Sequence, residues 1–344
     1  QSQAARDLAR PKKNSRFRIA LTGTPVENRV SELWALMDFL NPRVLGEEEF
    51  FRHRYRMPIE RYGDLSSLRD LKARVGPFIL RRLKTDKAII SDLPEKVELS
   101  EWVGLSKEQK SLYAKTVEDT LDAIARAPRG KRHGQVLGLL TKLKQICNHP
   151  ALALKEQGAS EDFLKRSVKL QRLEEILDEV MEAGDRALLF TQFAEWGKLL
   201  QDYLQRRWRS EVPFLSGSTS KSERQAMVDR FQEDPRGPQL FLLSLKAGGV
   251  GLNLTRASHV FHIDRWWNPA VENQATDRAY RIGQTNRVMV HKFITSGSVE
   301  EKIDRMIREK SRLAEDIIGS GEDWLGGLEM GQLKELVSLE DNQA

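Results

Sequence analysis

The segment QATDRAYRIGQT, residues 274–285, carries side chains that are suited to binding phosphate. Gln274, Arg278 and Arg281 are spaced by four and then three residues, and such positions lie above one another on one face of an α-helix. We therefore predict one helix that brings the three side chains to a small region. A guanidinium binds phosphate through two parallel hydrogen bonds, so one interpretation is a pair of arginine fingers directed at a nucleotide γ-phosphate. The alternative is a solvated basic face, the usual location of surface arginines.

Polar turns follow three apolar segments that have the composition of buried strands. Thr191 and Gln192 follow the first, SGST (216–219) the second, and SLKAGGVGLNLT (244–255) the third. In parallel α/β sheets, ligands bind beyond the carboxyl ends of the strands. Hydroxyl, amide and bare N–H groups at these ends suit a phosphate backbone, and glycines allow close approach. One glycine-rich turn is weak evidence, whereas three polar turns followed by Gln-x-x-x-Arg-x-x-Arg form a much stronger pattern.

The second half of the chain alternates apolar strands with amphipathic helices. Strands are expected within 186–193, 212–217, 239–244, 259–264 and 288–295, and helices at 167–184, 194–209 and 221–233. This alternation predicts an α/β domain with a parallel sheet that is covered by helices on both faces.

The first half is predicted to be mainly helical. The expected elements are a strand at 17–25, helices from 31 to about 90, a strand at 96–106, a helix at 107–127, an exposed loop at 128–135 and a helix from 136 that ends at Pro150. The loop is expected because PRGKRHGQ combines proline, glycine and basic residues.

Composition restricts the class of protein only loosely. The 344 residues include 56 Lys and Arg against 50 Asp and Glu, for a formal net charge of +6. That balance is compatible with nucleic-acid binding without being diagnostic of it. The single cysteine, Cys147, excludes an internal disulfide, and together with His149 it does not complete a tetrahedral site, so we predict no metal site. No apolar run is as long as a membrane span, and no membrane partner is predicted.

Ordered segments along nearly the whole chain resemble the motifs of the SWI/SNF family, which are double-stranded-DNA translocating ATPases of helicase superfamily 2. The segments are LTGTP, ILRRLKTD, LPEKVE, QICNHP, LFTQF, LSGSTS, SLKAGGVGLNLT, DRWWNPAVENQATDRAYRIGQT and VHKFIT. The resemblance implies two RecA-like lobes, each with a helical insertion, with ATP in the cleft between them and DNA across both. The implied boundaries are the end of the first lobe at 1–30, its helical insertion and a basic linker at 31–92, the insertion of the second lobe at 93–166, the second lobe at 167–318 and a C-terminal brace at 319–344.

The resemblance also implies roles for individual residues. Arg278 and Arg281 match the arginine fingers, and Gln274 matches the polar residue that accompanies them. The nucleotide-binding turn contains Gly249 and Gly251, and the motif that couples nucleotide to DNA contains Thr22, Gly23 and Thr24. The positions that match or adjoin DNA-contacting loops are Thr191, Gln192, Gly217, Ser218, Thr219, Ser244, Lys246, Asn253, Thr255 and Trp267. Stacking on a base is one interpretation of Trp266-Trp267, but at least one of the two indoles is expected to pack near the strand end. The implied cofactor is ATP with Mg²⁺, whose ligands are expected in the first lobe.

The sequence departs from the family pattern at the phosphate cradle. No Gly-x-x-x-x-Gly-Lys-Ser/Thr loop occurs, because the Gly-Lys pairs at 130–131 and 197–198 have the wrong neighbours. No Asp-Glu box follows a strand either, since Asp178-Glu179 lies in a predicted amphipathic helix. We therefore expect the C-terminal part of a larger ATPase, with the fingers but without the cradle, that is inactive alone.

Two other functions remain open. A strand-separating DNA or RNA helicase of the same superfamily is one, although RWWNP followed by RAYRIGQ favours the SWI/SNF branch. A non-catalytic fragment that binds DNA or a partner is the other. The expected partners are double-stranded DNA, the first RecA-like lobe of the same protein, and a protein such as a nucleosome, recombinase or polymerase. The expected location is the nucleus in a eukaryote and the nucleoid within the cytoplasm in a prokaryote.

Overall fold

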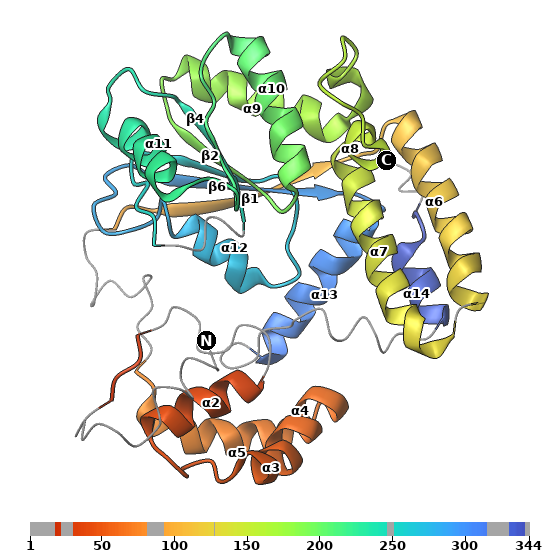
Figure 1. The fold of residues 1–344 in the computed structure, drawn as a ribbon, viewed down its shortest axis with the longest axis vertical. Helices are drawn as coiled ribbons and strands as arrows, with labels where there is room; N and C mark the ends of the chain where they lie inside the picture. Colours follow the sequence, from red (N-terminus) through yellow and green to blue (C-terminus); the bar gives the residue numbers. More distant parts are fainter. Residues whose placement is uncertain are drawn as a thin grey trace. The chain divides into compact units, whose positions relative to one another are not determined.

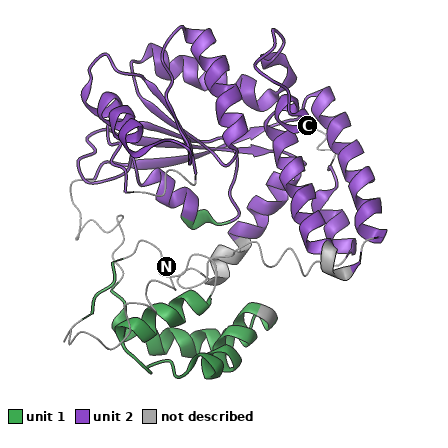
Figure 2. Ribbon diagram, viewed as in Figure 1, with its two compact units in different colours: residues 1–91, 268–270, 309–322 green, residues 92–267, 271–308, 323–344 purple. Residues whose placement is uncertain are grey.

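The computed structural model describes residues 18–21, 30–80, 93–126, 128–245, 251–314 and 330–340. The chain divides into two compact units (Figure 2). The first comprises residues 1–91, 268–270 and 309–322, and the second comprises residues 92–267, 271–308 and 323–344. None of the described helices is long and apolar enough to cross a bilayer.

The first unit is helical over its described residues. Its elements are α2 (Val30–Leu40), α3 (Glu48–Phe51), a π-helical turn (Arg52–Arg56), α4 (Met57–Tyr62), α5 (Leu65–Val75) and a 3₁₀ turn (Gly76–Phe78). Asp64 caps α5 by accepting hydrogen bonds from the N–H groups of Ser66 and Ser67. The helices bury an apolar core of their own. Helix was therefore correctly expected here, whereas residues 18–21 form no strand, and residues 17 and 22–25 lie outside the described residues.

The second unit is built on a six-stranded parallel sheet with the order β1-β6-β5-β2-β4-β3 (Figure 1). The strands are β1 (Lys96–Val103), β2 (Ala187–Thr191), β3 (Phe214–Leu215), β4 (Leu240–Ser244), β5 (His259–His262) and β6 (Val288–Thr295). In register, Thr191 lies opposite Ser244, and Phe190 lies opposite His262. The central strand β2 thus ends level with its neighbours β4 and β5, and the predicted α/β fold with a parallel sheet is confirmed.

Helices cover both faces of this sheet. Side chains alternate along a strand, so Leu189 packs in the cluster with α9 (Val168–Glu182) and α10 (Ala194–Trp208). Its neighbours Leu188 and Phe190 pack in the cluster with α11 (Lys221–Glu233) and α12 (Pro269–Thr276). Because both faces are buried, β2 and β4 are almost continuously apolar, as the sequence showed.

A helical extension adjoins the sheet (Figure 1). It contains α6 (Lys107–Arg126), α7 (Arg129–Asn148), α8 (Pro150–Leu154), α13 (Val299–Ala314) and α14 (Met330–Val337), and a 3₁₀ turn (Leu164–Arg166) precedes α9. An apolar cluster joins α6, α7, α13 and α14. The extension begins from β1, which pairs with β6 along its whole length. The sheet therefore includes a strand that precedes residue 167, where the second lobe was predicted to begin.

The exposed loop expected at 128–135 is wrong, because α7 begins at Arg129 and continues to Asn148. Pro128 occupies the N-cap position, where a residue without an N–H group breaks no helical hydrogen bond. Proline and glycine here start the helix instead of interrupting the chain. At the other end, α7 stops two residues before Pro150, which begins the short helix α8.

Candidate functional site

The segment with the two arginines is only partly helical. Helix α12 ends at Thr276, so Gln274 is on the helix while Arg278 and Arg281 lie in the turns that follow. At the two arginines the hydrogen bond to the carbonyl four residues back is replaced by shorter-range bonds, from Arg278 N to Ala275 O at 3.1 Å and from Arg281 N to Ala279 O at 3.1 Å. The expectation of one helical face for all three side chains is therefore wrong.

The end of α12 is fixed to the sheet by a buried hydrogen bond. The Thr276 hydroxyl lies 2.8 Å from His262 Nε2, and His262 is the last residue of β5. Beyond the helix, Gly283 adopts a φ of 98°, a conformation that glycine tolerates without strain. The arginines are thus carried by a compact turn beyond the carboxyl end of a strand.

Arg278 is a buried cation with an unsatisfied donor. Arg278 is 7% exposed, and its Nε has no hydrogen-bond partner among the described residues. Burial lowers its pKa, the positive charge of Arg281 lowers it further, and Asp277 opposes this effect. Arg281 itself is exposed. Two guanidinium groups close enough to repel each other, one of them desolvated, form a site whose electrostatics favour an anion.

The polar turn after β4 is hydrogen-bonded to this arginine turn. Leu254 N donates to Arg278 O at 2.8 Å, and Arg281 Nη1 donates to Leu252 O at 3.3 Å. The buried side chain of Gln284 joins the two turns again, since its Nε2 donates to Ala257 O at 2.9 Å and to Ala279 O at 3.1 Å. Sequence reasoning did not select Gln284, although it lies in the motif that drew attention to the arginines.

The predicted nucleotide and DNA residues of this turn are therefore next to the arginines. Gly251 is exposed with a φ of 27°, Asn253 is exposed, and Thr255 is half-buried. Lys246 and Gly249, like the coupling residues Thr22, Gly23 and Thr24, lie outside the described residues.

The SGST turn after β3 presents its tip to solvent. Ser216 N donates to Thr219 Oγ1 at 3.0 Å, and Thr219 N donates back to Ser216 O at 3.2 Å, which closes the turn. Gly217 and Ser218 are exposed, and a side chain added at Gly217 would meet nothing within 4 Å. An open turn of this kind suits contact with a phosphate backbone.

The turn after β2 is, by contrast, engaged within the protein. Thr191 is fully buried, and its hydroxyl donates to Asp264 Oδ2 at 2.5 Å. Gln192 N donates to Asp264 Oδ1 at 2.9 Å, and its side-chain Oε1 accepts from Lys144 Nζ at 3.2 Å. Gln192 is half-buried, whereas Ser244 at the end of β4 is buried. Of the predicted DNA contacts here, Gln192 alone has part of its side chain at the surface.

The two tryptophans that follow β5 differ in exposure. Trp267 is 6% exposed and packs in the cluster of the helical extension, whereas Trp266 is half-buried. The expectation that at least one indole packs near the strand end is confirmed. Trp267 therefore has little surface to offer to DNA. Its ring centroid lies 4.4 Å from Lys144 Nζ, on α7.

A buried polar network beneath these turns escaped the sequence analysis. Lys169 Nζ lies 2.8 and 2.9 Å from the carboxylate oxygens of Glu300 and 3.0 Å from Asn148 Oδ1, and Asn148 Nδ2 donates to Asp264 Oδ2 at 2.9 Å. The network thus runs from α13 through the end of α7 to the carboxylate that holds Thr191. One available signal was the placement of Lys169 among apolar residues, between Val168 and Leu170 on an amphipathic helix.

A second buried cluster holds the turn that contains the tryptophans. Arg265 Nε lies 2.9 Å from Glu272 Oε1 on α12, and the Arg265 guanidinium also pairs with Asp304 on α13. Glu272 Oε1 further accepts from Trp266 N at 2.8 Å. Burial by itself would raise the pKa of Glu272, but Arg265 outweighs it, so the pKa is lowered and the group stays ionised.

Cys147 and His149 are both buried, and the histidine is hydrogen-bonded within the protein. His149 Nδ1 accepts from Ala151 N at 3.0 Å, and Nε2 lies 2.7 Å from Phe163 O, so both ring nitrogens are used. Burial lowers the pKa of His149 to about 4 and raises that of Cys147 to about 12. Within the described ranges, no group of three His, Cys, Asp or Glu side chains is arranged to hold a metal ion.

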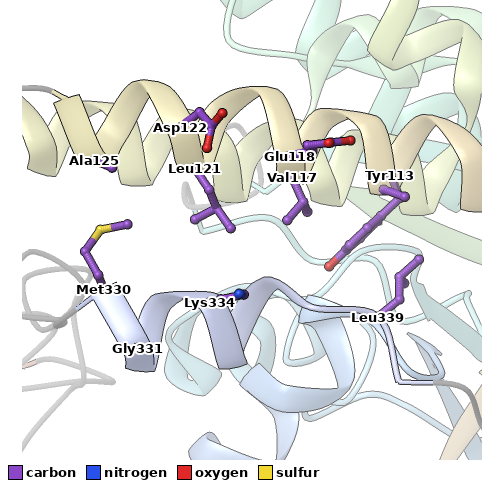
Figure 3. A pocket seen from close by; sticks show the side chains of 11 residues that line it. Tyr113, Val117, Glu118, Leu121, Asp122, Ala125, Met330, Gly331, Lys334 and Leu339 are labelled. Atoms are coloured by element: carbon purple, nitrogen blue, oxygen red, sulfur yellow. The ribbon is translucent and has the colours of Figure 1, made fainter.

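A groove of about 620 Å³ lies elsewhere, between α6 and α14 (Figure 3). Val117, Leu121 and Met330 line it, and Glu118 and Asp122 lie along α6. None of the predicted site residues lines this groove. The candidate site is instead the set of turns at the carboxyl edge of the sheet.

Comparison with known proteins places this arrangement in a family. The SNF2-related domain matches residues 1–152, and the helicase conserved C-terminal domain matches residues 168–283. The structure is similar to the SWI2/SNF2 ATPase core domain of Sulfolobus solfataricus, with a TM-score of 0.64 and 42% identity over 99% of this chain and 68% of that chain. The chain belongs to the SWI2/SNF2 family.

Two further relatives bear on function. The Sulfolobus solfataricus SWI2/SNF2 ATPase core in complex with dsDNA is 43% identical, with a TM-score of 0.64 over 98% of this chain and 72% of that one. The putative ATP-dependent helicase/translocase YwqA of Bacillus subtilis is 48% identical over 93% of this chain. The chain spans 34% of the length of YwqA, about a third.

Proposed function

We propose that this chain forms the second lobe of an ATP-dependent double-stranded-DNA translocase, in which Arg278 and Arg281 act on the γ-phosphate of ATP and the polar turns contact DNA phosphates. The observation that carries the proposal is the state of Arg278, which is buried, next to a second arginine, and has an unpaired Nε among the described residues. A surface arginine on a solvated basic face would be exposed and hydrated. A desolvated guanidinium binds an anion more strongly than a hydrated one does, because charge–charge attraction is stronger where water is excluded.

The same geometry supports different roles for the arginines, which act on the γ-phosphate, and for the polar turns, which contact DNA. Arg281 is exposed and anchored by one bond to Leu252 O, so it is free to approach a phosphoryl group presented by another lobe. Gly217, Ser218 and Asn253 are exposed on neighbouring turns, and hydroxyl, amide and N–H groups of this kind bind phosphate oxygens without reading base sequence. The dsDNA complex of the Sulfolobus solfataricus relative supports duplex DNA as the partner.

The residues present suit the anionic phosphates of ATP better than the metal that accompanies them. The arginine turn offers cationic donors, whereas within the described residues no acidic cluster could hold Mg²⁺. Bound Mg²⁺ would neutralise charge on the phosphates, and its ligands are expected in the first lobe. This chain's own contribution is to orient the γ-phosphoryl group and stabilise the charge that develops on it. The 344-residue chain, which has no phosphate-loop motif, is expected not to turn over ATP alone.

The test uses a parent enzyme with a complete first lobe. Arg278→Ala and Arg281→Ala should each lower ATP turnover at saturating duplex DNA about a thousandfold or more, with little change in duplex affinity. Arg281→Lys should restore little, because an ammonium cannot reproduce the planar two-pronged contact. The matched control is Arg287→Ala, since Arg287 is exposed, follows the same turn and pairs with Glu95. Normal turnover with a collapse of DNA affinity in both arginine variants would identify these residues as DNA ligands and refute the assignment.

A further inference from the structure

Lys144 is a buried cation at the base of the candidate DNA surface. It lies on α7, within the helix that ends in the QICNHP motif, and is 1% exposed. Its Nζ donates to Gln192 Oε1 at 3.2 Å and lies 4.4 Å from the ring centroid of Trp267 and 6.0 Å from that of Trp266. A residue of the helical extension thus contacts the turns that follow β2 and β5.

The ammonium of Lys144 has no ion-pair partner among the described residues. The carboxylates that face it are Asp264 beyond β5, Glu272 on α12 and Glu300 on α13, and a second cation, Lys169 on α9, opposes them. Asp264 is already bonded to Thr191, Gln192 N and Asn148, and Glu300 and Glu272 are paired with Lys169 and Arg265, respectively. The Lys144 ammonium therefore has no carboxylate of its own. One amide oxygen and the faces of two indoles stabilise its charge instead.

An ammonium in this position fixes the orientation of the Gln192 amide. A charged lysine has three donors and no acceptor, so the amide must turn its oxygen towards Lys144 and its NH₂ group away. One N–H of that group reaches Arg265 O at 3.3 Å, and Nε2 carries a second hydrogen. Phosphate oxygens only accept hydrogen bonds, so an outward NH₂ group is the useful orientation for DNA. A neutral lysine can also accept a hydrogen bond, so it would no longer distinguish the two amide orientations, and only the longer contact to Arg265 O would still favour the outward NH₂ group.

We propose that Lys144 is a positioning residue for DNA binding, whose ammonium holds the Gln192 amide with its NH₂ group outward and braces the Trp266–Trp267 turn. This inference rests on the proposed function, because it assumes that the turn after β2 lies against duplex DNA. Lys144 itself does not touch the DNA.

The proposal gives DNA binding a pH dependence that a purely packing role would not produce. Burial lowers the pKa of Lys144 to about 8, against the opposing attraction of Asp264, Glu300 and Glu272. Below pH 8 the ammonium orients the amide, and above pH 8 the preference for this orientation weakens as the amine becomes neutral. The affinity of the wild-type chain for duplex DNA should therefore fall roughly threefold to tenfold between pH 7 and pH 9, the factor expected for one lost hydrogen-bond donor.

Fluorescence anisotropy with a labelled duplex, at constant ionic strength from pH 7 to 9, measures this step in the 344-residue chain. Lys144→Met should bind with the weaker, high-pH affinity throughout and show no step. The matched control is Lys142→Met on the same helix, because the pKa of Lys142 is also lowered by burial but its ammonium bonds to Ala153 O. Lys142→Met should keep the step. Gln192→Leu keeps Lys144 in the chain but removes the amide that its ammonium orients, so it should abolish the step as well. This second variant keeps the test decisive if Lys144→Met does not fold.

The outcomes separate this proposal from the proposed function. The positioning role is overturned if the wild type binds duplex without a step. It is also overturned if the step survives in Gln192→Leu and in folded Lys144→Met. Both results leave DNA binding intact. A wild-type chain that binds no duplex at any pH overturns both.

Discussion

Two buried lysines should respond in opposite directions to the same substitution, Lys→Met. Lys169 is paired with Glu300, whose side chain is fully buried, at 2.8 Å. Lys169→Met removes the counter-charge of that carboxylate. The N–H of Thr295, 3.0 Å away, remains as a hydrogen-bond donor to it. Breaking a buried pair in this way costs about 3–5 kcal/mol of the free energy of unfolding. At about 2–4 °C per kcal/mol for a domain of this size, Tm should fall by roughly 6–20 °C.

Lys144→Met should instead stabilise the fold. Lowering the pKa of Lys144 from 10.5 to about 8 means that the charged form costs about 3 kcal/mol at neutral pH. Methionine fills the space of the lysine side chain up to its terminal amine and removes this cost. The lost hydrogen bond to Gln192 offsets about 1 kcal/mol of the gain. The expected net gain is about 1–3 kcal/mol at pH 7.

The pH dependence of that gain follows from proton binding. Between pH 8 and 10.5 the unfolded chain binds the Lys144 proton more tightly than the folded chain does. The charge on Lys144 therefore lowers the free energy of unfolding of the wild type by its full amount below pH 8, and this effect disappears as pH rises towards 10.5. The advantage of Lys144→Met over the wild type should shrink accordingly between pH 7 and pH 9.5.

Urea unfolding at both pH values, followed by circular dichroism and tryptophan fluorescence, measures these differences if the m-values agree. The double variant Lys169→Met/Glu300→Leu should recover most of the loss, because it leaves no buried carboxylate unpaired. Equal destabilisation by Lys169→Met and Lys144→Met would refute the reasoning, since it would mean that the Lys144 ammonium is net stabilising where it lies.

Three further predictions concern the rest of the second unit. Duplex affinity of the chain should fall steeply with salt and vary little among unrelated sequences in a binding titration, because phosphate contacts release counterions and carry no base readout. Gln284→Ala leaves Ala257 O and Ala279 O without their shared donor, so it should cost about 1–3 kcal/mol in urea unfolding and lower turnover of the parent enzyme more than its DNA affinity. Burial lowers the pKa of His149 and of His262 to about 4, so stability should decline as pH falls from 6.5 to 4, by about 3 kcal/mol for each histidine, and the urea midpoint across that range checks this.

The sheet was predictable because burial on both faces leaves an unambiguous pattern. Segments such as ALLFT and LFLLS are short, apolar and bounded by turns, so length and composition identify them as strands. Polar residues immediately after such strands then fall at the same edge whatever the strand order. The approach of the turn after β4 to the arginines could therefore be anticipated without knowing that β2 lies at the centre.

Local patterns failed where tertiary contacts decide the backbone. The spacing of Gln274, Arg278 and Arg281 fits a helix, but Thr276 bonds to His262 and Leu254 bonds to Arg278 O, and the chain leaves the helix between them. The proline and glycines near residue 130 indicated a loop, although proline at an N-cap is compatible with a helix that long-range packing supports.

The buried ions could not be predicted because their partners are distant in sequence. Lys169 and Glu300 are 131 residues apart, and Asn148 and Asp264 are 116 apart. A sequence pattern reports periodicity within one element and contains no information on which element packs against it. Charged residues on an apolar face are the only local indication, and they do not identify the partner.

The turn that carries the arginines bears on the proposed function, which requires contact with DNA to affect the nucleotide site. On a continuous helix, the arginines would be held by bonds within the helix and would be insensitive to the turn after β4. In the structure, Leu254 N bonds to Arg278 O and Leu252 O accepts from Arg281, so the backbone on both sides of exposed Asn253 is attached to the arginine turn. A displacement of Asn253 by a DNA phosphate would be transmitted through two hydrogen bonds to both arginines. A turn held by contacts to a neighbouring loop can change its position with that loop, and the proposed translocase would require this movement of its arginines.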